Sequence, residues 1–180
     1  MSKTKSTVVL DLLNKAHADE LAAILQYMSQ HYALAEADYG QIASQVKLIA
    51  IDEMLHSEKL AERINELGGA PNMKASLPVK HGQSIAEAMA YNETLEEGAI
   101  EDYSRAVKTC LENGDSISAK LFDLLAQEEQ AHLNWFSSVS RHIAELGPAY
   151  LAQVTGGSAD GGGAPPMGFV ASQKGGAKAA

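Results

Sequence analysis

The chain of 180 residues has one cysteine, five prolines, few aromatic residues and no long apolar run. Because Cys110 is alone, no intrachain disulfide can form, and a reducing compartment is expected. No stretch approaches the roughly 18 uncharged apolar residues of a membrane-spanning helix. Asp11 interrupts the only apolar run near the N-terminus, which argues against a signal peptide. We therefore expect a cytoplasmic protein without a membrane partner.

Positive charge is also scarce. The chain has 14 Lys and Arg against 23 Asp and Glu, which gives a formal net charge of −9 at pH 7. Binding to nucleic acid requires a basic stripe that neutralises phosphates, and none is present, so we expect no nucleic-acid partner. The length fits one domain with a substantial core.

Apolar residues recur at helical spacing over most of the chain, which predicts an all-α protein. The expected helices run over about residues 8–38, 42–67, 84–113 and 115–146, with a short fifth segment at 149–154. Gly40 is expected to end the first helix, and Ser84 with Glu87 has the sequence of a capping box. Two tight turns and one long connection, residues 69–83, predict a four-helix bundle with one long crossover.

The C-terminal part differs in composition from the rest. We expect one domain over residues 1–154 and a flexible, solvated tail over residues 155–180, because the tail is rich in Gly and Ala and contains Pro165-Pro166. The alternative is that Met167-Gly168-Phe169-Val170 is a docking peptide for a partner.

Two short strings place a carboxylate and an imidazole three residues apart in apolar helical sequence: Glu53 with His56, and Glu129 with His132. Positions i and i+3 of an α-helix share a face, so both side chains of a pair can reach one ion between packed helices. A single pair of this kind is usually a solvated helix face. Two copies favour a metal site.

Further residues repeat in register with these pairs. Glu20 lies 33 residues before Glu53 (53 − 20), and Glu96 lies 33 residues before Glu129 (129 − 96). A tyrosine follows each of the two upstream glutamates by seven residues, which is two helical turns, at Tyr27 and Tyr103. Each tyrosine either fills the core or binds a ligand carboxylate.

In the predicted bundle, six side chains meet at mid-height: Glu20, Glu53, His56, Glu96, Glu129 and His132. Four buried carboxylates without Lys or Arg beside them are costly, and two divalent cations would cancel their charge. Mixed Glu and His ligation favours iron or manganese over calcium or structural zinc. We expect Glu53 and Glu129 to bridge two ions, with each remaining glutamate joining the histidine of its own helix pair.

With these residues identified, the chain resembles a bacterioferritin over about residues 6–154. All six ligand positions of that family's ferroxidase centre match. The other shared segments are Asn14-Lys15, Gln26-Tyr27, Ile51-Asp52-Glu53-Met54, Glu62-Arg63-Ile64, Gly69-Ala70-Pro71-Asn72, Glu128-Glu129 and Trp135. The resemblance implies a ferritin-like bundle with a short C-terminal fifth helix and a di-iron centre, with Tyr27 beside it.

Met54 lies between two inward-facing ligands and therefore points outward, where a methionine suits a subunit interface. The resemblance implies more: in bacterioferritins this position supplies one of two methionines that hold a b-type haem across a two-fold interface. Several departures limit the comparison, and one is Tyr103, an aromatic residue that typical members do not carry at this position. The family's inner-surface iron site pairs a His with an Asp; Asp52 is present, but Leu48 replaces the His. Residues 148–153 also resemble a fifth helix that is one residue shorter than usual.

The function expected from this resemblance is iron storage. Fe²⁺ is oxidised to Fe³⁺ by O₂ or H₂O₂, and mineral collects in a hollow homo-oligomer, with 24 subunits as the first choice and 12 as the alternative. One rival is a rubrerythrin-like peroxidase, or another di-iron oxidase without storage. The other rival is a protein that holds haem or docks as cargo in a compartment. Particle size separates storage from both rivals.

Overall fold

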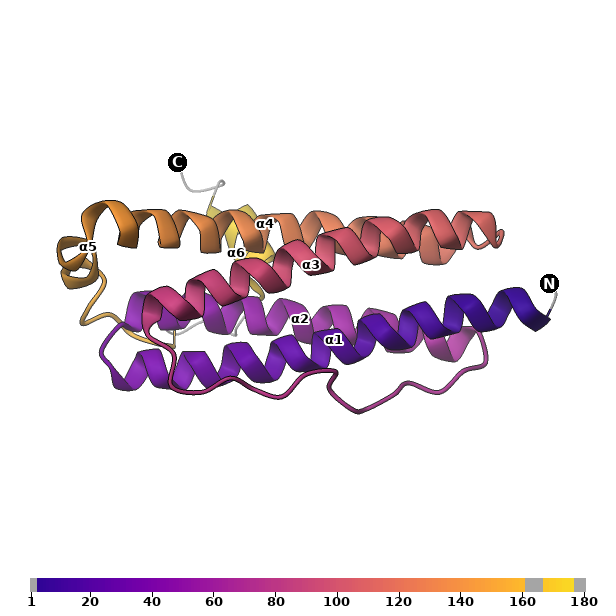
Figure 1. Ribbon diagram of the computed structural model, residues 1–180, viewed down its shortest axis with the longest axis horizontal. Helices are drawn as coiled ribbons and strands as arrows, with labels where there is room; N and C mark the ends of the chain where they lie inside the picture. The colour runs from indigo at the N-terminus through magenta and orange to yellow at the C-terminus, as the bar shows by residue number, and fades with distance from the viewer. Residues whose placement is uncertain (1–2, 161–166, 177–180) are drawn as a thin grey trace.

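The computed structural model describes residues 3–160 and 167–176. Its long helices are α1 (Lys3–Glu36), α2 (Gly40–Glu66), α3 (Ile85–Glu112) and α4 (Ser116–Leu146), followed by the short helices α5 (Pro148–Gln153) and α6 (Phe169–Gly176). The predicted all-α four-helix bundle with a short fifth helix is confirmed, and Figure 1 shows the long connection running beside α1. None of the described helices is long and apolar enough to span a membrane.

The turn between α1 and α2 differs in detail from the prediction. Asp38 takes the left-handed conformation, with φ of 63°. Gly40, expected to end the first helix, is instead the first residue of α2. A Cβ atom on Gly40 would lie 1.7 Å from the carbonyl oxygen of Gly157, so the close approach of the C-terminal chain explains the glycine at this position.

Caps define the starts of the second helix pair. The Ser84 side chain accepts a hydrogen bond from the Glu87 N–H, and the Glu87 carboxylate accepts one from the Ser84 N–H, which completes the predicted capping box. Asp115 caps α4 by accepting from the Ser118 N–H. The Asp115 carboxylate also accepts two bonds from Arg63 of α2, at 2.9 and 3.0 Å, which ties the end of α2 to the start of α4.

The long connection is fixed to α1 by hydrogen bonds along its length. The Ser76 N–H donates to the Ala18 carbonyl at 2.9 Å, and the Lys80 N–H donates to the Gln26 side chain at 2.8 Å. These bonds satisfy backbone groups that a solvated loop would leave to water. The connection therefore runs over α1 on both sides of Glu20 in sequence.

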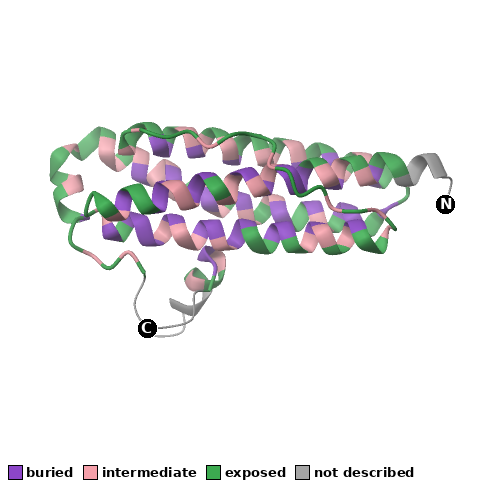
Figure 2. Ribbon diagram, turned by 90° about the horizontal axis from the view of Figure 1, so that it is seen from below, coloured by how far each residue is buried: buried purple, intermediate pink, exposed green. Residues whose placement is uncertain are grey.

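The interior contains two apolar clusters. One includes Val9, Leu13 and Leu60, and the other includes Ile49 and Phe136. On each of the four long helices, buried polar residues lie between the residues of one apolar cluster and those of the other, and together they form a polar layer. Figure 2 shows the buried positions running along the inside of the bundle. The apolar clusters hold the helices in register on each side of this polar layer.

Part of the C-terminal tail differs from the predicted solvated segment. Lys47 forms an ion pair of 2.7 Å with Asp160, and α6 lies against α2 and α4. Phe169 is buried. The prediction rested on Gly-rich composition, which reports backbone freedom and not the apolar surface that one aromatic side chain can cover. The Pro165-Pro166 pair lies outside the described residues.

Candidate metal centre

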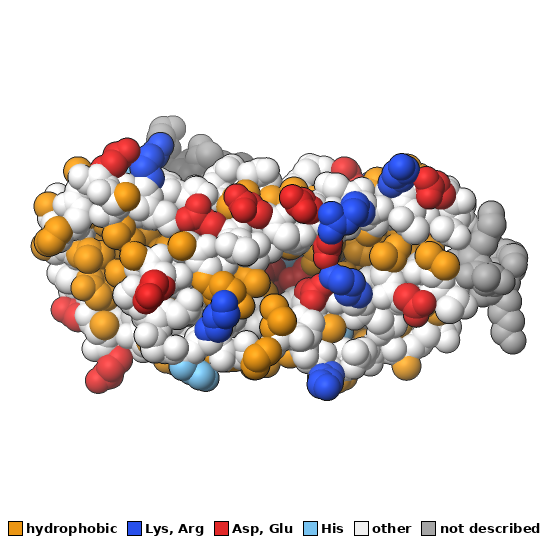
Figure 3. Space-filling model, in the orientation of Figure 1, with side chains coloured by type: hydrophobic (Ala, Val, Ile, Leu, Met, Phe, Trp, Pro, Cys, Tyr) orange, Lys and Arg blue, Asp and Glu red, His pale blue; other side chains and the backbone are white. Residues whose placement is uncertain are grey.

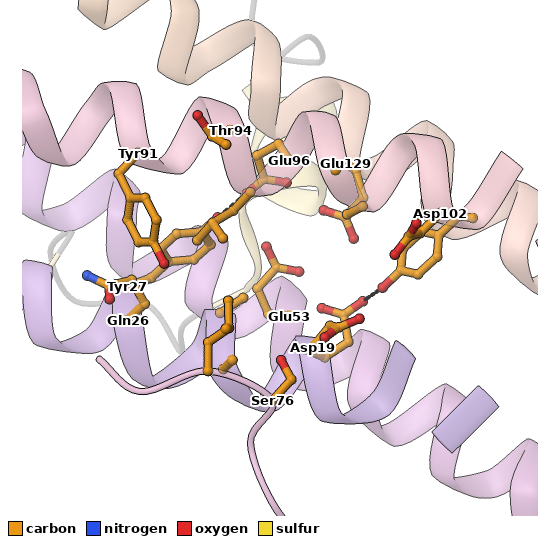
Figure 4. A pocket seen from close by; sticks show the side chains of 18 of the residues that line it. Asp19, Gln26, Tyr27, Glu53, Ser76, Tyr91, Thr94, Glu96, Asp102 and Glu129 are labelled. Atoms are coloured by element: carbon orange, nitrogen blue, oxygen red, sulfur yellow. Dashed lines mark hydrogen bonds between the residues drawn. The ribbon is translucent and has the colours of Figure 1, made fainter. Parts of the chain in front are cut away.

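Four carboxylates and two imidazoles converge in the middle of the bundle. Glu20 comes from α1, Glu53 and His56 from α2, Glu96 from α3, and Glu129 and His132 from α4. Each of these six side chains is at most 3% exposed. Figure 4 shows the carboxylates of Glu53, Glu96 and Glu129 pointing toward one another from three helices. The structure thus brings together all six side chains that the sequence selected.

The six side chains form two groups that overlap. One group is Glu20, Glu53, His56 and Glu129; the other is Glu53, Glu96, Glu129 and His132. Within each group, one ligand atom from every residue lies within 4.8 Å of the others. Glu53 and Glu129 belong to both groups, so the geometry divides the residues in the way expected for two ions with two shared carboxylates.

The inner nitrogen of each imidazole faces the carboxylates. His56 Nδ1 lies 3.0 Å from Glu53 Oε2, 3.0 Å from Glu129 Oε1 and 3.6 Å from Glu20 Oε1. His132 Nδ1 lies 3.0 Å from Glu129 Oε2, 3.3 Å from Glu53 Oε1 and 3.6 Å from Glu96 Oε2. The two rings stack with centroids 5.8 Å apart. The arrangement has the approximate two-fold symmetry that the sequence repeat predicts.

Several of these polar atoms lack a hydrogen bond. Glu53 Oε2, His56 Nδ1 and Glu129 Oε1 are buried without a partner of suitable geometry, although His56 Nδ1 is close to both oxygens. Within residues 3–160 and 167–176, no Lys or Arg lies within ion-pair distance of the four carboxylates. Such groups are expensive to bury unless cations neutralise them. The donor set therefore fits two divalent cations.

The pKa shifts in the cluster have the same cause, which is the burial of several charged groups close together. Burial, and then repulsion from neighbouring carboxylates, raise the pKa of Glu20 and Glu96 well above its ordinary value. Burial opposes charge on His56 and His132, yet the surrounding carboxylates raise the pKa of both imidazoles. Burial alone would raise the pKa of Glu129, but the two imidazoles hold it below its usual range. Without a metal, these shifts favour protons on Glu20, Glu96 and the two imidazoles.

The outer nitrogen of each histidine also has an acidic partner, which was not predicted from the sequence. His56 Nε2 of α2 lies 2.9 Å from Glu128 of α4, and His132 Nε2 of α4 lies 3.2 Å from Asp52 of α2. Partners of this kind fix which nitrogen carries the proton and leave the other free for a metal. A signal was available: an acidic residue directly precedes each shared glutamate, at the same 76-residue offset (129 − 53 and 128 − 52).

The two tyrosines cross between the helix pairs. The Tyr27 hydroxyl on α1 donates to Glu96 on α3, and the Tyr103 hydroxyl on α3 donates to Glu20 on α1. Both side chains are buried. The sequence left two alternatives open for each tyrosine, which were core filling and a hydrogen bond to a carboxylate of the cluster. Both apply, because each hydroxyl binds a carboxylate and each ring packs against a phenylalanine.

A cavity of about 210 Å³ lies beside the cluster, between α1, α3 and the long connection. All four carboxylates of the cluster and both tyrosines contribute to its lining. Lys15, Asp19 and Asp102 line it as well and are partly exposed, with Lys15 Nζ 2.8 Å from Asp19 and 2.5 Å from Asp102. Figure 3 shows acidic side chains deep in a hollow on this face. The cavity gives small solutes a path to the carboxylates.

Three other residues selected from the sequence lie outside the cluster. Met54 is 50% exposed, which agrees with its expected outward direction. Trp135 packs against Phe136 in the apolar core. Leu48 also packs against the core, at the position where the family's inner-surface site would require a histidine.

Comparison with known proteins identifies the family. The Ferritin family profile, described as "Ferritin-like domain", matches residues 10–146. The chain is 47% identical to a bacterioferritin of Desulfovibrio desulfuricans over 148 residues, which cover 82% of this chain and 83% of the relative. The chain belongs to the bacterioferritin family.

Solved bacterioferritin structures share the fold. An X-ray structure of the Desulfovibrio desulfuricans bacterioferritin, whose description names a diiron site in different catalytic states, has a TM-score of 0.88 and 44% identity, covering 90% of this chain and 95% of that one. A Rhodobacter capsulatus bacterioferritin, described with a metal-free dinuclear site and a haem iron, has a TM-score of 0.80 and 28% identity, covering 87% and 98%. Membership of the bacterioferritin family therefore rests on sequence and structure together.

Proposed function

We propose that the protein is an iron-storage ferroxidase, in which Glu20, Glu53, His56, Glu96, Glu129 and His132 bind two Fe²⁺ ions as substrate. The observation that carries the proposal is the pair of overlapping, buried ligand groups that share Glu53 and Glu129 and that have no ion pair to Lys or Arg in the described part of the chain. The naming of a diiron site in the Desulfovibrio relative supports iron as the metal.

The proposed reaction is a two-electron oxidation. Two Fe²⁺ ions each lose one electron; with O₂ as oxidant, two protons are taken up and H₂O₂ is formed. With H₂O₂ as oxidant, the O–O bond breaks and two water molecules form with two protons. The carboxylates favour the ferric state because they stabilise the higher charge, and Tyr27 and Tyr103 hold two of them in place. The cavity beside α1 and α3 admits small oxidants.

The proposal is tested by stopped-flow absorbance after Fe²⁺ is added to the apo-protein. Glu53→Ala and His132→Ala should lose the rapid oxidation phase, because each removes a ligand from the cluster. Glu97→Gln is the matched control, since Glu97 is the exposed neighbour of Glu96 on α3. Oxidation by Glu53→Ala and His132→Ala at the wild-type rate would overturn the assignment.

Met54 is the proposed haem ligand. Its side chain is half exposed on the outside of α2, so a thioether is available on the surface of one chain. Two such methionines from two copies would hold one haem, which would supply an electron-transfer group. The haem iron named for the Rhodobacter relative supports this cofactor.

Storage requires a hollow assembly, and we propose a homo-oligomer of 24 subunits, with 12 as the alternative. The nearly complete coverage of the bacterioferritin structures supports a cage of their kind. A native mass measurement decides between the two shells. A dimer would instead favour the rubrerythrin-like peroxidase or the haem-holding cargo protein.

Because Cys110 is a free, buried thiol, we propose the cytoplasm as the compartment.

A further inference from the structure

The C-terminal segment lies against one of the two histidine ligands. Phe169, at the start of α6, is 4% exposed, and its ring lies edge-on to His132 with centroids 5.9 Å apart. The same ring is 6.0 Å from that of Trp135, one turn further along α4. Phe169 therefore helps to shield the His132 ring from solvent.

The backbone of this segment contacts the partner of His132. The Val170 N–H donates to Asp52 Oδ2 at 2.7 Å, and the same oxygen lies 3.2 Å from His132 Nε2. Asp52 is 5% exposed, so the N–H helps to satisfy a carboxylate that is otherwise costly to bury. Val170, Asp52 and His132 thus form a chain of hydrogen bonds that ends at the metal ligands.

Residue 168 is a glycine for a steric reason. A Cβ atom at Gly168 would lie 1.7 Å from Asp52 Oδ1 and 2.6 Å from Asp52 Cγ. The carboxylate cannot move aside freely, because His132 and Val170 both bind it. The approach of the tail to Asp52 therefore depends on glycine at this position.

The two histidines differ in how their outer partners are satisfied. Glu128, beside His56, is bound by Lys59 of α2 at 3.1 Å. Asp52, beside His132, is bound instead by the backbone of the C-terminal segment. His56 thus depends on the bundle alone, whereas His132 depends on whether residues 168–170 are in place.

We propose that Gly168, Phe169 and Val170 are positioning residues for the metal centre, which fix the Asp52 carboxylate and close the α2 and α4 side of His132. The inference rests on the proposed function, because it treats His132 as a metal ligand. It has two consequences. Asp52 is committed to the hydrogen-bond chain and does not serve as a separate cation ligand, and ions reach the centre from the cavity beside α1 and α3.

The test uses the full-length apo-protein and Co²⁺ as the probe, with visible absorption bands reporting each ion. Val170→Pro removes the N–H in the first turn of α6, where proline is tolerated. Val170→Ala keeps the N–H and is the matched control. We expect two Co²⁺ ions per chain in the wild type and in Val170→Ala. In Val170→Pro, one of the two should bind about tenfold more weakly with shifted bands.

A second readout needs no metal. Trp135 is the only tryptophan, so its fluorescence and its quenching by acrylamide report whether Phe169 covers it. Gly168→Ala and Phe169→Ala should increase quenching and weaken the same Co²⁺ site. Met167→Ala, at a half-exposed position, should do neither.

The outcomes separate the two proposals. If the wild type binds no pair of Co²⁺ ions, both the proposed function and the positioning role are wrong. If the wild type binds two but Val170→Pro and Gly168→Ala leave both affinities and both sets of bands unchanged, only the positioning role is overturned. Equal weakening of both ions in Val170→Pro also overturns it, because the structure connects the segment to His132 and not to His56.

Discussion

Tyr103 on α3 donates its hydroxyl proton to Glu20 on α1, 83 positions earlier in the chain. The bond joins the two helix pairs and holds the carboxylate of a proposed metal ligand. Tyr27 makes the matching bond in the other direction, to Glu96. Each half of the bundle therefore orients a carboxylate that belongs to the other half.

Tyr103→Phe and Tyr27→Phe should each weaken metal binding by about tenfold, because the carboxylate loses the bond that orients it. Competition titration of the apo-protein with Co²⁺ and a chelator measures the change. Tyr91→Phe is the matched control, since Tyr91 lines the same cavity but its ring lies under Lys80. Equal affinities for Tyr103→Phe and Tyr91→Phe would show that the bond to Glu20 has no part in ligand orientation.

Asp115→Ala should lower the free energy of unfolding by about 2 kcal/mol, because it removes a helix cap and leaves the partly buried Arg63 with Glu66 as its remaining carboxylate partner. Urea unfolding of the apo-protein measures the loss. Asp123→Ala, at an exposed position on the same helix, should change the stability by less than about 0.5 kcal/mol. A similar loss in both variants would contradict the importance of the cap.

The contribution of the Asp115 charge should depend on pH. Burial alone would raise the pKa of this carboxyl, but hydrogen bonds from Ser118 and Arg63 lower it below the ordinary value. A depressed pKa contributes stability above the unfolded-state value of about 3.9, and that contribution is lost as the pH falls through the folded-state value. The stability difference between wild type and Asp115→Asn should therefore be constant from pH 7 to 5 and narrow below about pH 4. Urea unfolding at pH 7, 5 and 3 measures this; a gap that widens in acid has the wrong sign.

Met54→Ala should abolish haem binding, because the proposed site consists of one thioether from each of two chains. Absorption titration with haem should saturate at one haem per two chains for the wild type. Met73→Leu is the control, since Met73 is also exposed but lies in the long connection. Undiminished haem binding by Met54→Ala would remove this residue from the site.

The parts that the sequence predicted depend on local patterns. The four helices follow from apolar periodicity and from caps such as Ser84 and Asp115, whose signals lie within a few residues of where they act. The six-residue cluster was predictable because residues i and i+3 share one face of a helix, and because the same 33-residue spacing between glutamates occurs in both helix pairs. The start of α2 at Gly40 was not predictable, because glycine is required there by the close approach of the Gly157 carbonyl, which is distant in the sequence.

The contacts of the C-terminal segment were not predictable for a related reason. Glycine-rich sequence reports backbone freedom, whereas the position of Phe169 depends on a surface formed by Trp135 and His132. Asp52 and Glu128 could have been found, since each precedes a shared glutamate. Each of these acidic residues contacts the histidine of the other helix, and this pairing becomes visible only when α2 and α4 are packed together.

Anomalous X-ray scattering at the iron edge, from crystals loaded with Fe²⁺ without oxygen, tests the central claim most directly. We expect two iron peaks per chain, both contacting Glu53 and Glu129, with one beside His56 and Glu20 and the other beside His132 and Glu96. Crystals in which these six side chains surround no iron, while iron is bound elsewhere on the chain, would contradict it.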